Sequence, residues 1–337
     1  MKKLFLAIFA VMTCVVVTAK NTVKVSFNGS TATITIDDNL KDFVTCTSGT
    51  LSHVVLVQAE TVADSNPGEI TYELSGNSDN GGFELKGSYK CTVKLAGLTL
   101  TNTEGAAINI DNGKRIELNA NKDGGTNTLS DGANGDWKAC VYTKGHFELK
   151  GKGALTIVGN TAHAISSKEY MQVKNLTLNI TGAKKDGIHC KQYFWMQSGK
   201  ISISGAKDDG IQVELDGKTS TGILPDHEDA DADIDEDTGN FYQDDGTLSI
   251  KDFGKTAIKT DGQVIINGGT QDYYASAVSE NNNPATAITV LRQDDTRQNN
   301  TKDEVIYDLT GRLLKDMRKG KVVIIKKDNE IKKVIVQ

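Results

Sequence analysis

The sequence predicts an all-β fold in which the chain winds as a parallel β-helix, or solenoid. Short stretches of alternating apolar and polar residues recur along the chain, separated by polar turns that contain glycine. The apolar residue that opens the second strand of each unit recurs every 20 to 24 residues. Long stretches with a helical period of 3.6 residues are missing, which argues against a helical bundle.

Length, charge and glycine content limit the number of domains and argue against several classes of protein. The 337 residues allow one large or two medium domains. The chain carries 44 acidic and 38 basic residues, a formal net charge of −6, which argues against a broad nucleic-acid surface. The 33 glycines show no three-residue period, so a collagen-like structure is excluded.

The first residues predict a secretory signal peptide that ends at Ala19. Lys2 and Lys3 precede an apolar run of 14 residues, 4–17, and small residues follow it. Fourteen apolar residues are too few to span a bilayer, and no other stretch approaches that length. A lipoprotein signal with Cys14 as the lipidated residue is the alternative, which we disfavour because the apolar run continues past Cys14.

The body of the chain, 20–301, is predicted to be the solenoid. Each unit has two recognisable strands, and a unit buries its apolar face only when neighbouring units stack on it. The residues that open the second strand are Val141, Ile165, Ile188, Ile211, Ile258 and Val278. Because a strand buries alternate residues, the lumen is predicted to contain Leu155, Ile157, Leu176, Leu178, Ile201 and Ile203.

The period breaks once, between Ile211 and Ile258, where the excess residues 214–245 form an acidic loop. This loop has 12 acidic residues and one lysine, so it is not expected to form a packed core. Its alternating aspartates are typical of the start of a calcium loop, but Ile234 and Asn240 occupy the positions of the EF-hand Gly and Glu. We therefore favour a solvated acidic loop.

The cysteines and the C-terminal tail complete the organisation. An exported chain permits disulfides, but the spacing of the four remaining cysteines fits no metal cluster, and we favour isolated thiols. Their disulfide state stays open from the sequence; they are Cys46, Cys91, Cys140 and Cys190. The tail, 302–337, predicts a strand from Val305 and a hairpin formed by 322–325 and 331–336.

The repeated A-x-x-D-G-I pattern carries a resemblance to a known family. It stands in 182–188 and 205–211, and the stretches 69–76 and 95–100 fit the same family. Over roughly residues 50–280 the chain resembles a bacterial carbohydrate-binding β-helix family of the polysaccharide lyase-like superfamily, first defined in cellulolytic clostridia. The resemblance implies a right-handed parallel β-helix, calcium at Asp-rich turns and affinity for cellulose-like or polygalacturonate-like chains, but not cleavage.

A second, shorter resemblance concerns the tail. Residues 307–312 and the hairpin that follows are similar to the C-terminal sorting domain of type IX secretion in Bacteroidetes. The resemblance implies a protein secreted from, or held on the surface of, a Gram-negative bacterium. Whether the segment is cleaved stays open.

Two aspartates in register predict a calcium site. Alignment on the recurring Ile places Asp186 directly below Asp209 on the next coil, about 4.8 Å away. Two carboxylates at that distance repel, and one calcium ion accepts oxygens from both. We predict Asp186 and Asp209 as shared ligands with Asp208 assisting, and Gly187 and Gly210 as the residues that permit the tight turn. The alternative is an Asp-Gly turn whose carboxylate caps its own backbone.

The candidate glycan contacts are an aromatic ring and three lysines. Phe194 and Met196 align with apolar positions of neighbouring units, so Trp195 is predicted to point outward as a sugar platform, with a stack between coils as the alternative. Tyr193 and Trp137 are weaker candidates. The lysines beside the aspartates could pair with uronate carboxylates: Lys184, Lys185 and Lys207. A lone histidine such as His163 is more often structural than a ligand.

The residues favour binding over catalysis. A uronate lyase needs a metal and a base near the substrate, and Arg115 is the only arginine between the signal and residue 291. Arg115 is far in sequence from the aspartates, although Lys185 or Lys207 could serve as a base. We therefore expect a secreted, monomeric, calcium-bearing polysaccharide-binding protein without catalytic residues. A weak uronate lyase and a structural surface or adhesin protein are the alternatives.

Overall fold

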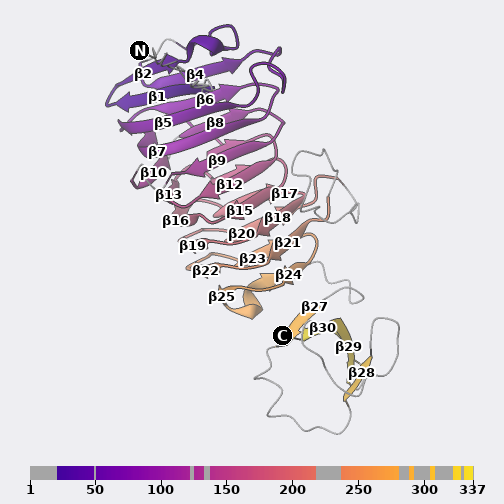
Figure 1. Cartoon of the computed structure of the whole chain (residues 1–337). Coiled ribbons are helices and arrows are strands. Elements are labelled where there is room, and N and C mark those ends of the chain that lie inside the picture. The colour runs from indigo at the N-terminus through magenta and orange to yellow at the C-terminus, as the bar shows by residue number, and fades with distance from the viewer. Residues whose placement is uncertain are drawn as a thin grey trace, which may run out of the picture.

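The structure is a computed structural model that confirms the all-β solenoid (Figure 1). It describes residues 21–48, 51–121, 125–132, 137–217, 237–280, 288–291, 304–307, 322–327 and 330–336. The predicted signal peptide with Cys14 and residues 218–236 of the acidic loop lie outside the described residues. Within the described residues, no helix is long and apolar enough to cross a membrane.

Each complete coil contains three short strands joined by two turns and a sharp corner. One coil consists of β15 (Met171–Lys174), β16 (Thr177–Ala183) and β17 (Ile188–Lys191). Every strand pairs in parallel with its equivalents one coil before and one coil after. The solenoid therefore has three faces, one more than the two strands recognised in each sequence unit.

The strands of each face follow one another along the solenoid axis. The first face contains β9 (Ile116–Ala120), β12 (Phe147–Gly151), β15, β18 (Tyr193–Met196), β21 (Asn240–Gln243) and β24 (Val264–Ile266). The second contains β10 (Asn127–Asp131), β13 (Ala154–Gly159), β16, β19 (Lys200–Ser204), β22 (Thr247–Lys251) and β25 (Thr270–Asp272). The third contains β3 (Val44–Cys46), β4 (His53–Gln58), β6 (Gly82–Lys86), β8 (Ile108–Asp111), β11 (Ala139–Thr143), β14 (His163–Ser167), β17, β20 (Ile211–Glu214), β23 (Ile258–Thr260) and β26 (Val278–Ser279).

The first two faces merge at the N-terminal end into one 16-stranded sheet. The long strand β7 (Cys91–Asn102) pairs by its first half with β9 and by its second half with β10. The sheet continues from β7 through β5 (Ile70–Ser78) to the hairpin of β1 (Thr22–Asn28) and β2 (Thr31–Ile36). Among the described residues, the solenoid also has the short 3-10 helices η1 (Asp38–Leu40) and η3 (Ala275–Ala277).

The predicted register is confirmed strand by strand. Val141 pairs with Ile165, and the pairing continues along the third face through Ile188, Ile211 and Ile258 to the last rung. The six residues predicted to face the lumen all belong to one continuous buried core. Period-2 alternation decides this arrangement, because a shift of one residue would expose every apolar side chain.

The C-terminal sheet begins earlier in the chain than expected. The predicted hairpin is present as β29 (Val322–Lys327) and β30 (Glu330–Val336), with β28 (Glu304–Tyr307) beside it. However, β27 (Ile288–Leu291), which the prediction placed in the solenoid, pairs in parallel with β30. A strand that lies before the predicted boundary at residue 301 therefore completes the four-stranded sheet.

The four cysteines of the described chain are free thiols. Cys91, Cys140 and Cys190 are buried, and burial raises the pKa of the Cys91 thiol to about 12. Cys46 is exposed. The prediction of isolated thiols is confirmed in this structure.

Candidate functional site

The turn that leads from the second face to the third carries the predicted aspartate column. Asp186 and Asp209 stand on successive coils, and each is only 1% exposed. Asp186 Oδ1 accepts a hydrogen bond of 2.9 Å from the backbone N–H of Asp209. Asp209 Oδ1 in turn accepts bonds from the backbone N–H and the hydroxyl of Thr256, at 3.0 and 2.5 Å. Each carboxylate thus caps the backbone of the next coil rather than its own.

The same turn leaves oxygen atoms for a cation. Asp186, Asp208 and Asp209 each offer a carboxylate oxygen, and these atoms lie within 4.8 Å of one another. Asp209 Oδ2 is buried and has no hydrogen-bond partner within the described structure. A buried carboxylate oxygen without a partner is costly, and hard cations prefer oxygen ligands of this type. The three side chains therefore fit a calcium ion.

Two basic side chains touch this acidic group. Lys255 Nζ forms an ion pair with Asp208 Oδ1. His163 Nδ1 lies 3.0 Å from Asp186 Oδ2. Burial raises the pKa of Asp186, but the contacts with His163 and the N–H of Asp209 outweigh it, so the pKa of Asp186 is lowered below its usual value. The carboxylate is therefore ionised at neutral pH and available as a ligand.

The glycines after the aspartates are required for a reason other than the one predicted. Gly187 and Gly210 are absent from the positive-φ positions of the described chain. A Cβ atom at Gly187 would lie 2.7 Å from the carbonyl oxygen of Gly210 and from Cγ2 of Ile203. At Gly210 it would lie 2.4 Å from Cγ2 of Ile250. Close packing between coils, rather than a left-handed turn, thus excludes a side chain here.

The sequence reading missed a pair of histidines beside the aspartates. The rings of His163 and His189 stack with centroids 4.7 Å apart. His189 Nε2 lies 3.3 Å from Glu214 Oε2, so the two stacked rings connect the carboxylate of Asp186 to that of Glu214. The two histidines occupy different positions of their units, and the strand register alone does not bring such rings together. The stacking of the two rings depends on the direction in which each side chain points from its strand.

Acidification is expected to destabilise the fold through His189. Burial, followed by the charge of His163, lowers the pKa of His189 below 6.5, against the opposing effects of Glu214 and Asp186. The unfolded chain then binds more protons than the folded chain as pH falls below about 6.5, so stability falls. The variant His189→Gln should show a smaller drop in melting temperature between pH 7 and pH 5 than the wild type. The variant His53→Gln, on β4, is the control, and an equal flattening there would contradict the assignment.

The three predicted lysines lie in the aspartate turns. Their backbone N–H groups tie the turn to the preceding coil, at Gly159, Ala162 and Ala183. Their side chains are exposed and form no ion pair with the described residues. They are Lys184, Lys185 and Lys207. The structure therefore places them near the candidate metal ligands, available to an acidic ligand.

Trp195 is not the exposed platform that was predicted. Its side chain points away from the lumen core, as expected, but is only 3% exposed. The ring packs with Tyr170, Tyr193 and Tyr242, and its Nε1–H donates a 2.7 Å hydrogen bond to Asp244. The alternative of an aromatic stack between coils is the one observed. Tyr193, which is 5% exposed, belongs to the same cluster. The lysines of the aspartate turns do not.

Arg115 lies within a separate cluster of charges on the first face. Its guanidinium is 2.5 Å from Glu69 Oε2 and 3.7 Å from Glu148 Oε2. Glu117 is 4.0 Å away. Glu148 is fully buried and also pairs with Lys150 at 2.5 Å. This arginine is held as a cation among carboxylates, apart from the aspartate column.

Comparison with known proteins finds relatives of this chain. A family model described as "Carbohydrate-binding domain-containing protein" matches residues 58–331. A protein of the same description from Acetivibrio thermocellus is 24% identical over 125 residues, which cover 35% of this chain and 43% of the relative. The chain thus spans less than half the length of that relative.

A solved structure shares the fold. It is described as the polysaccharide lyase-like protein from C. thermocellum, in a gadolinium derivative. It matches with a TM-score of 0.54 at 19% sequence identity, and the match covers 77% of this chain and 99% of that chain. At this identity the likeness establishes the architecture alone.

Proposed function

The chain belongs to the family of carbohydrate-binding domain-containing proteins, and from this membership we propose that it is a secreted, calcium-binding protein that binds polysaccharide without cleaving it. The family match, which spans residues 58–331, is the observation that carries the binding function. Cellulose-like and polygalacturonate-like chains are the proposed ligands. The predicted signal peptide and the resemblance of the tail to a sorting domain support export to the surface of a Gram-negative bacterium.

Calcium is proposed as a structural ion at Asp186, Asp208 and Asp209. The unpartnered, buried Asp209 Oδ2 within this group of carboxylates supports the assignment. A divalent cation would neutralise the repulsion between carboxylates on neighbouring coils and hold the turns in register. The exposed side chains of Lys184, Lys185 and Lys207 would then face an acidic glycan beside the ion.

We propose that the protein does not cleave its ligand because of the surroundings of its candidate bases, Arg115, Lys185 and Lys207. A lyase base must accept a proton from the carbon next to the uronate carboxylate. Arg115 is surrounded by Glu69, Glu117 and Glu148, which stabilise its charged form. Lys185 and Lys207 have exposed side chains, and no side-chain contact with the described residues holds either amine in place for proton transfer.

Binding to a glycan array, with and without a calcium chelator, tests the proposal. We expect retention on plant cell-wall glycans of the cellulose or pectin type, and weaker retention after chelation because the coils lose a stabilising ion. Absence of retention on every polysaccharide would contradict binding and favour the structural or adhesin alternative. Incubation with polygalacturonate and calcium should give no unsaturated uronate absorbance. A product that disappears in Lys185→Ala would instead establish the lyase alternative.

A further inference from the structure

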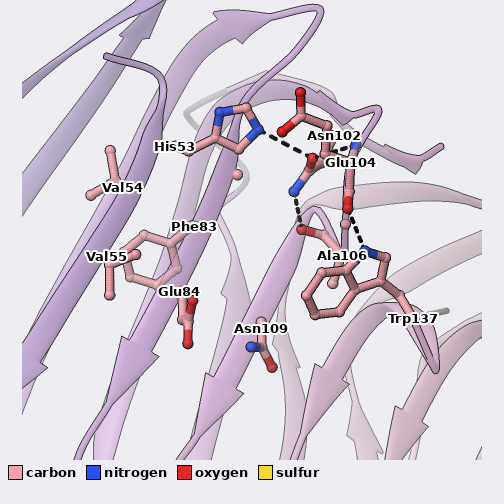
Figure 2. Close-up of a pocket in the computed structure, with 12 residues that line it drawn as sticks. His53, Val54, Val55, Phe83, Glu84, Asn102, Glu104, Ala106, Asn109 and Trp137 are labelled. Atoms are coloured by element: carbon pink, nitrogen blue, oxygen red, sulfur yellow. Dashed lines mark hydrogen bonds between the residues drawn. The ribbon is translucent and has the colours of Figure 1, made fainter. Parts of the chain in front are cut away.

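Trp137 is an exposed aromatic ring at the edge of the third face. Its side chain is 45% exposed, whereas Trp195, the only other tryptophan of the sequence, is 3% exposed. The indole N–H donates a hydrogen bond to the backbone carbonyl of Glu104 (Figure 2). The ring also packs over Gly105, where a Cβ atom would lie only 3.0 Å from Cε2 of the indole. The ring is therefore held in one orientation while much of its surface stays open to solvent.

A buried amide supports the turn beneath this ring. Asn102 is 6% exposed, and its Nδ2 donates a 2.7 Å hydrogen bond to the carbonyl of Ala106. Its Oδ1 accepts the N–H of Glu104 at 3.0 Å and lies 3.2 Å from Nε2 of His53. One side chain thus fixes both the turn on which the indole packs and the imidazole across the hollow from it (Figure 2). Such a preorganised surface loses little entropy when a ligand binds.

Two hollows meet at Trp137 and form one trough. The first, of about 250 Å³, is bounded by His53, Glu84, Asn102 and Glu104 as well as the indole. The second, of about 280 Å³, is bounded by the indole together with Asp111, Lys138, Tyr142 and Lys144. Both hollows also share Ala106 and Asn109. The indole therefore stands in the middle of the trough.

The floor of the trough is built from outward positions of the third face. Glu84, Asn109 and Tyr142 are in register on β6, β8 and β11. Three strand spacings separate β4 from β11, so the trough is about 14 Å long, longer than one pyranose ring. Asn109 makes no side-chain hydrogen bond within the described structure, so its amide is available to a ligand as donor and acceptor. These dimensions suit several units of an extended chain.

The charges of the trough discriminate between glycans. The carboxylates of Glu84 and Glu104 line the hollow beside the indole, and Glu84 pairs with Lys86 at 3.3 Å. In the second hollow, Lys144 is paired with Asp111 at 2.5 Å, and Lys138 lies over the ring of Tyr142 at 5.7 Å. Carboxylates accept hydrogen bonds from sugar hydroxyls but repel uronate carboxylates. A neutral chain is therefore favoured over an acidic one.

We propose that this trough is a subsite for a neutral polysaccharide whose pyranose rings carry equatorial hydroxyls, as in a β-1,4-glucan. Such a ring presents a face of C–H groups, which packs on the indole of Trp137. Its hydroxyls donate to Glu84 and exchange hydrogen bonds with Asn109 and His53. The inference rests on the proposed polysaccharide-binding function and adds both the position and the chemical class of the ligand.

Titration calorimetry with cellohexaose and a hexameric oligogalacturonate tests the subsite on the full-length chain. The trough is expected to bind cellohexaose, whereas the oligogalacturonate would bind at the lysines of the aspartate turns, which line neither hollow, so its affinity should be unchanged in Trp137→Ala. Trp137→Ala should weaken cellohexaose binding about tenfold or more, as expected for an aromatic anchor. Asn109→Ala should weaken it about three- to tenfold, as expected for lost hydrogen bonds. Tyr274→Ala is the matched control, because Tyr274 is 79% exposed and lines neither hollow, and it should leave binding unchanged.

A second readout keeps the test independent of any folding defect. Acrylamide should quench the exposed Trp137 and spare the buried Trp195, and cellohexaose should protect the quenched fraction in the wild type. Wild-type cellohexaose affinity in both Trp137→Ala and Asn109→Ala, or an equal loss of oligogalacturonate affinity in Trp137→Ala, would overturn the subsite while polysaccharide binding stands. If the wild type binds no glycan on the array, the proposed function itself fails, and the subsite with it.

Discussion

Removal of calcium is expected to lower the melting temperature of the wild type by about 5 °C or more. A ligand held at about 100 times its dissociation constant stabilises the folded state by about 2.7 kcal/mol, and 1 kcal/mol corresponds to about 2–4 °C in a domain of 150–250 residues. The gain arises because Asp209 Oδ2 is buried without a partner among Asp186 and Asp208. Thermal unfolding with excess calcium and with chelator measures the effect.

The double variant Asp186→Asn with Asp209→Asn isolates the metal from the backbone caps. An asparagine keeps a side-chain oxygen that can accept the N–H of the next coil, but it removes the charge that attracts the ion. The melting temperature of this variant should no longer respond to calcium, and calorimetry should show lost calcium binding. Asp245→Asn, on an exposed aspartate, is the control and should respond like the wild type. A double variant that still responds would place the ion elsewhere.

Replacement of Arg115 by methionine is expected to lower the free energy of unfolding by about 3 kcal/mol. Loss of one partner from a buried ion pair leaves an uncompensated charge, which typically costs about 3–5 kcal/mol. Arg115 is 13% exposed and approaches Glu69, Glu117 and Glu148, and the last of these is fully buried. Lys150 still pairs with Glu148, which keeps the expected loss at the lower end. The midpoint of urea unfolding measures it.

A half-exposed ion pair supplies the matched control for Arg115. Lys94 and Glu73 lie 2.8 Å apart with side chains 35% and 26% exposed, and Lys94→Met should cost at most about 1 kcal/mol. Adding Glu148→Gln to Arg115→Met should restore part of the stability, because the buried charge is then removed as well. If Arg115→Met lowers the free energy of unfolding no more than Lys94→Met does, the charges around Arg115 do not behave as a buried ion network.

The register of the solenoid could be predicted because it repeats. The recurring Ile positions and the strict alternation within strands specify which residues lie over one another, and the pairing of Ile188 with Ile211 follows. The same register placed Asp186 below Asp209, so the acidic column could be predicted before the structure was known. The prediction nevertheless gave each unit only two strands, because first-face strands such as β15 and β18 are buried at consecutive positions and lack the alternation that marks the second face.

The surroundings of the site could not be predicted in the same way. His163 and His189 stack although they occupy different positions of their units. Trp195 points outward as expected, yet neighbouring tyrosines and Asp244 cover it. The sequence made Trp137 a weaker candidate for a sugar contact than Trp195. Its exposure and its place between two hollows distinguish it in the structure. Outside the lumen, burial depends on which side chains neighbouring coils happen to supply.

The sequence by itself thus determined the all-β solenoid, its lumen and the vertical alignment of the aspartates. These properties follow from a repeated pattern that every coil must obey in order to bury its apolar face. The tertiary structure alone decided which tryptophan is exposed, which charges meet at Arg115 and that Asp209 Oδ2 is left without a hydrogen-bond partner. Those properties are set by turns and side chains that differ from coil to coil, and no repeat constrains them.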